Sequence, residues 1–140
     1  MIILDTNVLS ECLRPNPDQS VLRWLSAQPR ARLFTTTVVE SEIQYGIQLM
    51  PGGARKLALT EAVRGIFDED FAGRVLAFDR DAAAAYAEIA SSRKLAGRPI
   101  TQFDAMIAAV ALATGAVLAT RNTKDFEGCK IDLLNPWELS

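Results

Sequence analysis

Short apolar segments alternate with longer amphipathic segments along the chain. Each apolar run is four or five residues long, the length of a buried strand. The predicted strands are residues 1–4, 32–36, 74–78, 116–120 and, as a further candidate, 131–134. The predicted helices are approximately residues 8–13, 18–26, 37–50, 54–69, 79–97 and 101–114. This alternation predicts an α/β fold, with a central parallel sheet of four to five strands flanked by helices on both faces.

Residues that start and stop helices support these boundaries. Thr37 and Glu40 have the spacing of a capping box, and the Pro51-Gly52-Gly53 sequence ends the helix that they start. No linker, internal repeat or low-complexity segment interrupts the chain. A length of 140 residues is typical of one domain, so we expect residues 1–140 to form a single domain.

The composition excludes several classes of enzyme. The chain has no histidine, which removes Ser-His-Asp and Cys-His nucleophile pairs and zinc sites with His ligands. Cys12 and Cys129 lie far apart and form no CxxC motif, so neither a disulfide framework nor a cysteine-rich metal site is expected. Any catalysis must therefore come from carboxylates, a metal ion, lysine or backbone groups.

We expect a cytoplasmic protein with no membrane association. Asp5 and Glu11 interrupt the N-terminal apolar residues, and no basic segment precedes them, unlike in a secretory signal. The apolar segment at 105–119 is shorter than the about 20 residues that a membrane span needs. The net charge of −2 gives no overall attraction to nucleic acid, so nucleic-acid binding would require a local basic patch.

Three acidic residues occupy positions that folding alone does not select. Asp5 directly follows the first predicted strand, where it also suits a helix N-cap. Glu42 falls between two groups of apolar residues on its helix, where a carboxylate must be ion-paired, protonated or metal-bound. Asp104 is the only charged residue between positions 99 and 120, which predicts a largely buried side chain, although its spacing from Thr101 also suits helix capping.

These acids are expected to meet at one edge of the sheet. In open α/β sheets the functional site lies beyond the carboxyl ends of the strands, where Asp5 and the segment after Thr120 should fall. Three converging carboxylates repel one another unless a cation lies among them. A site made only of oxygen ligands suits Mg²⁺ or Mn²⁺.

Four motifs together resemble the PIN-domain ribonucleases, and specifically the VapC-type toxins of bacterial toxin–antitoxin pairs. They are MIILDTNVLSE, TTTVVESEIQYG, ITQFDAMIAAVA, and LATRNTKDFEG followed by LLNPWEL. The overall layout and the NPW ending are most similar to the FitB-like branch. The resemblance implies a PIN fold and a Mg²⁺-dependent acidic site that cleaves RNA by metal-assisted hydrolysis.

The resemblance also assigns roles to individual residues. Asp5, Glu42 and Asp104 match the first three acidic positions and are implied to be catalytic and to hold the metal, while Thr120 supports them by hydrogen bonding. Many relatives have Asp where this chain has Asn122, which offers a carbonyl oxygen but no charge. Asp125 lies three residues later and is a candidate replacement, so both one and two metal ions stay open.

Basic residues near these motifs are candidates for holding RNA. Arg98, Arg121 and Lys124 are the predicted RNA-binding residues, as a basic rim around the acidic pocket. Arg93 and Lys94, at the end of the 79–97 helix, either extend this rim or simply interact with the helix C-terminus.

The resemblance further implies protein partners. These are a cognate small antitoxin and a second copy of the chain, in a homodimer within a larger toxin–antitoxin complex, with the helices at 8–13 and 38–50 as candidate contact surfaces. The alternative function is a catalytically silent PIN-fold module that binds an antitoxin-like partner. Receiver and haloacid-dehalogenase proteins also place Asp at strand ends, but the latter expect a second Asp where this chain has Asn7.

Overall fold

A five-stranded parallel sheet forms the centre of the molecule. The computed structural model describes residues 1–139, and its strands follow the order β3-β2-β1-β4-β5. The strands are β1 (Ile2–Leu4), β2 (Leu33–Thr36), β3 (Val75–Leu76), β4 (Val117–Ala119) and β5 (Leu133–Leu134). In β1, Ile2 pairs in register with Leu33 on one side and with Val117 on the other. The predicted α/β fold with a parallel sheet is confirmed.

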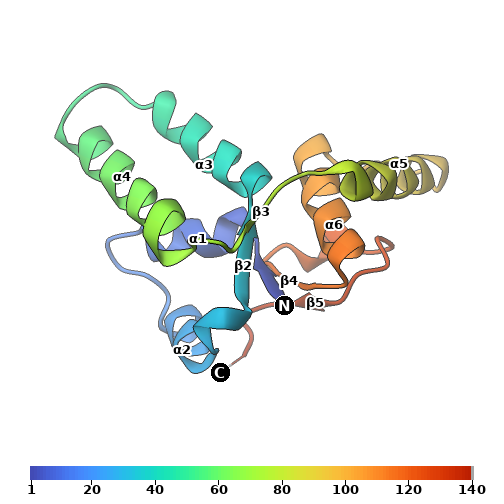
Figure 1. The fold of residues 1–140 in the computed structure, drawn as a ribbon, viewed down its shortest axis with the longest axis horizontal. Coiled ribbons are helices and arrows are strands. Elements are labelled where there is room, and N and C mark those ends of the chain that lie inside the picture. Colours follow the sequence, from blue (N-terminus) through green and yellow to red (C-terminus); the bar gives the residue numbers. More distant parts are fainter. Residues whose placement is uncertain (140) are drawn as a thin grey trace.

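Six α-helices surround this sheet. They are α1 (Thr6–Cys12), α2 (Gln19–Ala27), α3 (Thr37–Gln48), α4 (Ala54–Gly65), α5 (Arg80–Leu95) and α6 (Gln102–Thr114). Figure 1 shows α3 and α4 projecting together on one side of the molecule, and α5 and α6 lying together on the other. No helix in residues 1–139 has the length and apolar character needed to cross a bilayer.

The central strand β1 is buried on both of its faces. Ile2, Ile3 and Leu4 are all at most 4% exposed, although successive side chains of a strand point to opposite faces. This explains why β1 is a continuous apolar run rather than an alternating one. Asp5 and the polar residues after it therefore follow directly from a strand that is packed on both sides.

Side-chain caps start several of the helices. The Thr36 hydroxyl accepts a hydrogen bond from the Val39 N–H at 3.0 Å, so α3 is capped by the last residue of β2. The cap predicted from the Thr37–Glu40 spacing is thus wrong by one residue. The Thr101 hydroxyl caps α6 in the same way, and Gly115, with φ of 69°, ends that helix in the left-handed conformation.

The segment predicted as one helix over residues 54–69 changes geometry near its end. The α-helix stops at Gly65, and Ile66–Asp70 continues as a π-helical turn. The wider turn leads the chain back to the short edge strand β3, whose two residues are fewer than the five predicted at 74–78.

Candidate active site

The candidate site lies at the carboxyl edge of the sheet. Asp5 directly follows β1, and Thr120 directly follows the neighbouring strand β4. The backbone N–H of Asp5 donates to the carbonyl of Ala119 at 3.0 Å, which extends the β1–β4 pairing to the site itself. Asp5 is 4% exposed and Thr120 is fully buried.

Hydrogen bonds fix the orientation of the Asp5 carboxylate. Its Oδ1 accepts from the backbone N–H of Thr6 at 2.8 Å, and its Oδ2 accepts from the Thr120 hydroxyl at 2.7 Å. The Asn7 side-chain amide lies 3.4 Å from the same Oδ2. The carboxylate is therefore held in one orientation before any ligand arrives.

Asn7 joins three parts of this edge of the sheet. Its Nδ2 donates to the Thr120 hydroxyl at 3.2 Å, and its Oδ1 accepts from the backbone N–H of Arg121 at 3.2 Å. From the sequence, Asn7 was identified only as the residue found where haloacid-dehalogenase proteins have a second Asp, so this connecting role was missed. Its position two residues after Asp5, at the end of a buried strand, was the available signal.

Glu42 faces the site from α3. Its Oε1 accepts a hydrogen bond from the Thr6 hydroxyl at 2.9 Å, and its side chain is half-buried. Burial raises the pKa of Glu42 most, and the negative charge of Asp104 raises it further. Among residues 1–139 no Lys or Arg forms an ion pair with Glu42, so the alternative of a buried salt bridge is wrong.

Asp104 enters from the first turn of α6. It is half-buried, not largely buried as predicted, because that turn lies at the exposed end of an otherwise buried helix, next to the exposed Phe103. Burial raises the pKa of Asp104 most, the charge of Asp125 raises it further, and the Thr101 hydroxyl and the charge of Arg93 lower it.

The three acids interact electrostatically. Burial is the main cause that raises the pKa of Asp5 to about 6, while Asp104 and Glu42 add to the rise and the hydrogen bonds from Thr120 and Thr6 oppose it. Within the described residues none of the ion pairs includes any of these acids. Within residues 1–139 the negative charge of the site is therefore not balanced by a direct ion pair.

The donor atoms suit a hydrated hard cation. The carboxylates of Asp5, Glu42 and Asp104 and the Thr120 hydroxyl supply oxygen atoms at this site, and oxygen ligands suit Mg²⁺ and Mn²⁺. No group of three acidic, His or Cys residues in positions 1–139 is close enough to hold one ion by direct contacts alone. This arrangement fits Mg²⁺, which commonly binds through one or two carboxylates and keeps several of its waters.

The predicted fourth position is divided between two residues. Asn122 is exposed, and its contact with the site is a backbone N–H that donates to the Thr120 hydroxyl at 3.1 Å. Asp125 lies in the short 3₁₀ turn Thr123–Phe126, and its charge raises the pKa of Asp104. Asp125 is exposed, and its charge is the one from this segment that reaches Asp104.

The basic residues predicted around the site have different environments. Arg98 forms an exposed ion pair with Glu127 at 3.0 Å, whereas Arg121 and Lys124 are exposed. Arg93 is 8% exposed and donates to backbone carbonyls, so neither of its predicted roles, on the rim or at the helix C-terminus, describes it.

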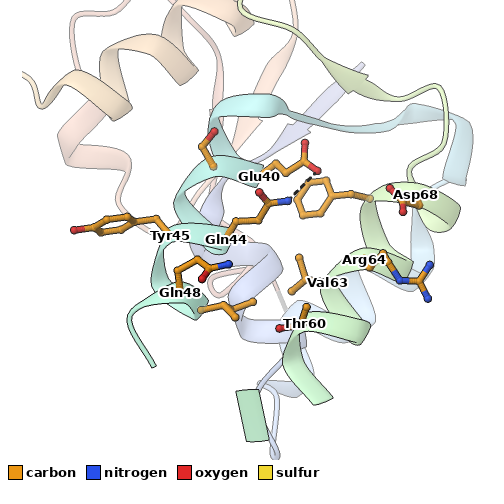
Figure 2. Close-up of a pocket in the computed structure, with 11 residues that line it drawn as sticks. Glu40, Gln44, Tyr45, Gln48, Thr60, Val63, Arg64 and Asp68 are labelled. Carbon is orange, nitrogen blue, oxygen red and sulfur yellow. Dashed lines mark hydrogen bonds between the residues drawn. The ribbon is translucent and has the colours of Figure 1, made fainter. Parts of the chain in front are cut away.

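Two clefts lie near α3, and only the smaller reaches the acids. The larger, of about 630 Å³, lies between α3 and α4. Figure 2 shows Gln44 and Gln48 of α3 facing Val63 of α4 across it, with Tyr45 pointing away. The smaller, of about 390 Å³, is lined at one end by Thr6 and Glu42 and is therefore continuous with the candidate site.

Comparisons with known proteins agree with this geometry. The family model described as the PIN domain matches residues 2–128. The chain is 41% identical over 138 residues to the VapC ribonuclease Y4jK of Sinorhizobium fredii, which covers 99% of each chain. It is 38% identical over 137 residues to the toxin FitB of Neisseria gonorrhoeae, which covers 98% of this chain and 99% of the relative.

A solved structure is similar over the full length. The structure of FitAB bound to an IR36 DNA fragment contains a chain with a TM-score of 0.93 and 38% identity to this one, covering 100% of this chain and 98% of the other. The similarity therefore extends over the whole chain, including the segments that carry the candidate site.

Proposed function

Because this chain belongs to the PIN-domain family, among its VapC- and FitB-type toxins, we propose that it is a metal-dependent endoribonuclease and the toxin of a toxin–antitoxin pair. One observation carries the proposal. The buried Asp5 is oriented by Thr6 and Thr120, its burial raises its pKa to about 6, and Asp104 and Glu42 lie close enough to add to that rise. Such a set of unpaired carboxylates is suited to metal-assisted phosphodiester hydrolysis.

Asp5 and Asp104 would hold Mg²⁺, directly or through its waters, and Mn²⁺ would suit the same oxygen ligands. When bound, the ion stabilises negative charge on the phosphate oxygens and lowers the pKa of a bound water. Asp125, rather than Asn122, supplies the additional negative charge near Asp104. The uncharged Asn122 makes a site with one well-held ion the simpler expectation.

Glu42 is suited to act as the general base. The Thr6 hydroxyl holds its Oε1 at 2.9 Å, which leaves Oε2 able to accept a proton from the attacking water. As that proton moves to Glu42, the water oxygen bonds to phosphorus and the ribose oxygen on the opposite side leaves. The raised pKa of Glu42 makes it a stronger base than an ordinary carboxylate.

RNA must approach this acidic site along a basic path. Arg121 and Lys124 flank the fourth motif and are exposed, so they are the side chains best placed to bind the phosphate backbone. Arg98 is expected to contribute less because Glu127 already pairs with it.

An antitoxin is the expected protein partner. FitB is found with FitA in the similar solved complex, and by extension we expect this chain to bind a small antitoxin and to form homodimers within a larger assembly. The helices α1 and α3 remain the candidate contact surfaces. Tyr45 of α3 and Leu49, which directly follows this helix, are 65% and 68% exposed and are hydrophobic side chains that a partner could cover.

Expression in a bacterial host tests the proposed role. We expect the wild-type chain to stop growth and to produce new RNA ends in total RNA. Co-expression of the protein encoded by the neighbouring gene, which is the candidate antitoxin, should relieve both effects. The Asp5→Asn variant should be harmless. Harmless expression of the folded wild-type chain without new RNA ends would instead favour the catalytically silent module, for which the exposed Asn122 at an acidic position is the supporting observation.

A further inference from the structure

The backbone of Arg121 is fixed by the same network that holds Asp5. Its N–H donates to Asn7 Oδ1 at 3.2 Å, and its carbonyl accepts from Asn135 Nδ2 at 3.5 Å. Asn135 directly follows β5, the strand next to β4. Arg121 is therefore anchored between two strand ends, one residue after Thr120.

The side chain of Arg121 lies on an aromatic ring. Its Cζ is 5.1 Å from the ring centroid of Trp137, within the range of a cation–π interaction. The backbone N–H of Trp137 donates to Asn135 Oδ1 at 2.9 Å, which fixes the turn that carries the ring. Stacking on a ring orders a guanidinium while leaving the N–H groups at its edges free to donate.

Other arginines near the site already have protein partners. Arg98 pairs with Glu127, and Arg93 donates to three backbone carbonyls. Within residues 1–139 the guanidinium of Arg121 makes no ion pair and no hydrogen bond. Its donors are therefore available to a ligand, and a phosphate, like a carboxylate, matches the geometry of a planar guanidinium.

We infer that Trp137 is a positioning residue that holds the Arg121 guanidinium ready to bind an RNA phosphate beside the acids. The inference rests on the proposed function, because it concerns how the same site takes its substrate. The acids repel a phosphate, and an ordered cation at the same edge of the sheet would offset part of that repulsion. Because Trp137 restricts the side chain in advance, less conformational entropy is lost when RNA binds.

RNA binding without cleavage tests this inference. The probe is a fluorescein-labelled single-stranded RNA of about 20 nucleotides and random sequence, in EDTA, because a phosphate contact is independent of base sequence. We expect Arg121→Gln to weaken binding about tenfold and to reduce the slope of log affinity against log salt by about 0.7, the value for one phosphate contact on a single strand. Arg32→Gln is the matched control. Arg32 is exposed and directly precedes β2, so it lies at the amino ends of the strands, away from the candidate site.

Trp137 variants separate positioning from a purely structural role. We expect Trp137→Leu to weaken binding about threefold to fivefold and Trp137→Phe, which keeps an aromatic ring, to restore most of it. In an Arg121→Gln background, Trp137→Leu should have no further effect.

Three results would overturn the inference: unchanged binding in Arg121→Gln, unchanged binding in Trp137→Leu, or an equal loss on adding Trp137→Leu to Arg121→Gln. Thermal melting of each variant identifies those that fail to fold. If Trp137→Leu fails to fold, Trp137→Phe is the variant whose RNA binding is compared with that of the wild type. Cleavage that needs Mg²⁺ but is unaffected by both substitutions would reject this inference and leave the proposed function standing.

Discussion

The ionised form of Asp5 lowers the free energy of unfolding of the metal-free protein. Burial and the neighbouring acids raise its pKa from 3.8 to about 6, so the folded state binds the proton more tightly than the unfolded state does. Well below pH 3.8 both states are protonated and the cost is absent. As pH rises from 4 to 6 the unfolded state loses its proton first, so stability falls, and above pH 6 the full cost of about 3 kcal/mol persists.

Replacing Asp5 with Asn should therefore stabilise the metal-free protein at neutral pH. We expect the free energy of unfolding of Asp5→Asn to exceed that of the wild type by about 2 kcal/mol at pH 7 and by much less at pH 4. Urea unfolding in EDTA across this range measures the difference. Asp132→Asn, an exposed acid at the start of β5, is the control and should change stability by less than about 0.5 kcal/mol. A variant less stable than the wild type at pH 7 would contradict this account.

Thr120 keeps Asp5 ionised at working pH. Its hydroxyl donates to Asp5 Oδ2 at 2.7 Å and lowers the pKa of that carboxyl, so Thr120→Val should raise it. We expect RNA cleavage to fall at least about tenfold and the acidic limb of the pH–rate profile to move to higher pH. Thr120→Ser keeps the hydroxyl and should behave as the wild type. An acidic limb that stays in place in Thr120→Val would show that the hydroxyl does not act through Asp5.

At the residue scale, unpaired acids were easier to predict than their polar partners. Glu42 and Asp104 could be selected because each interrupts an apolar pattern that is visible in the sequence. The hydrogen-bond partners of Thr6 and Asn7 could not be predicted, because they are 36 and 113 residues away. Their roles depend on which strand lies beside β1, which local patterns do not specify.

Among the helices and loops, Arg93 connects the end of α5 to the segment that carries Asp125. Its guanidinium donates to the carbonyls of Arg98, Asp125 and Glu127 at 2.7, 2.8 and 3.0 Å, and it also lies 3.6 Å from the sulfur of Cys129. The sequence placed Arg93 correctly at a helix end, but its carbonyl partners come from loops whose course the sequence pattern does not predict.

Removing this guanidinium should destabilise the protein. Arg93→Met keeps the length of the side chain but leaves three carbonyls without their donor, and we expect a loss of about 3 kcal/mol in the free energy of unfolding. The neighbouring exposed substitution Lys94→Met is the matched control, with an expected change within about 0.5 kcal/mol. Chemical denaturation measures both, and equal stabilities for the two variants would contradict the role given to Arg93.

Helix and strand positions were predictable where a local signal was strong. The Asp18 and Thr101 caps form as their residue types suggest, with Asp18 accepting from the N–H of Ser20 at 2.8 Å. The α3 cap was misplaced because Thr36 and Thr37 are adjacent residues of the same type. The π-helical turn after Gly65 was not predicted, because it depends on how the chain turns toward β3 rather than on helix propensity.

At the scale of the whole molecule, the strand order creates the site. Placing β1 between β2 and β4 brings Asp5 beside Thr120 and close to the start of α3, which carries Glu42. Strand alternation predicted a parallel sheet but not this order, since many orders satisfy the same alternation. The motif resemblance implied a specific fold, and with it a strand order, because a resemblance to a family concerns the complete fold rather than local segments.

The most direct test of the account is the rate of RNA cleavage by the purified chain as a function of Mg²⁺ concentration. The account predicts cleavage that rises to saturation with Mg²⁺, disappears in EDTA, and falls at least about a hundredfold in Asp5→Asn. Asp132→Asn should cleave like the wild type. Equal cleavage in EDTA, or equal rates for wild type and Asp5→Asn, would contradict the claim that these carboxylates hold a catalytic metal ion.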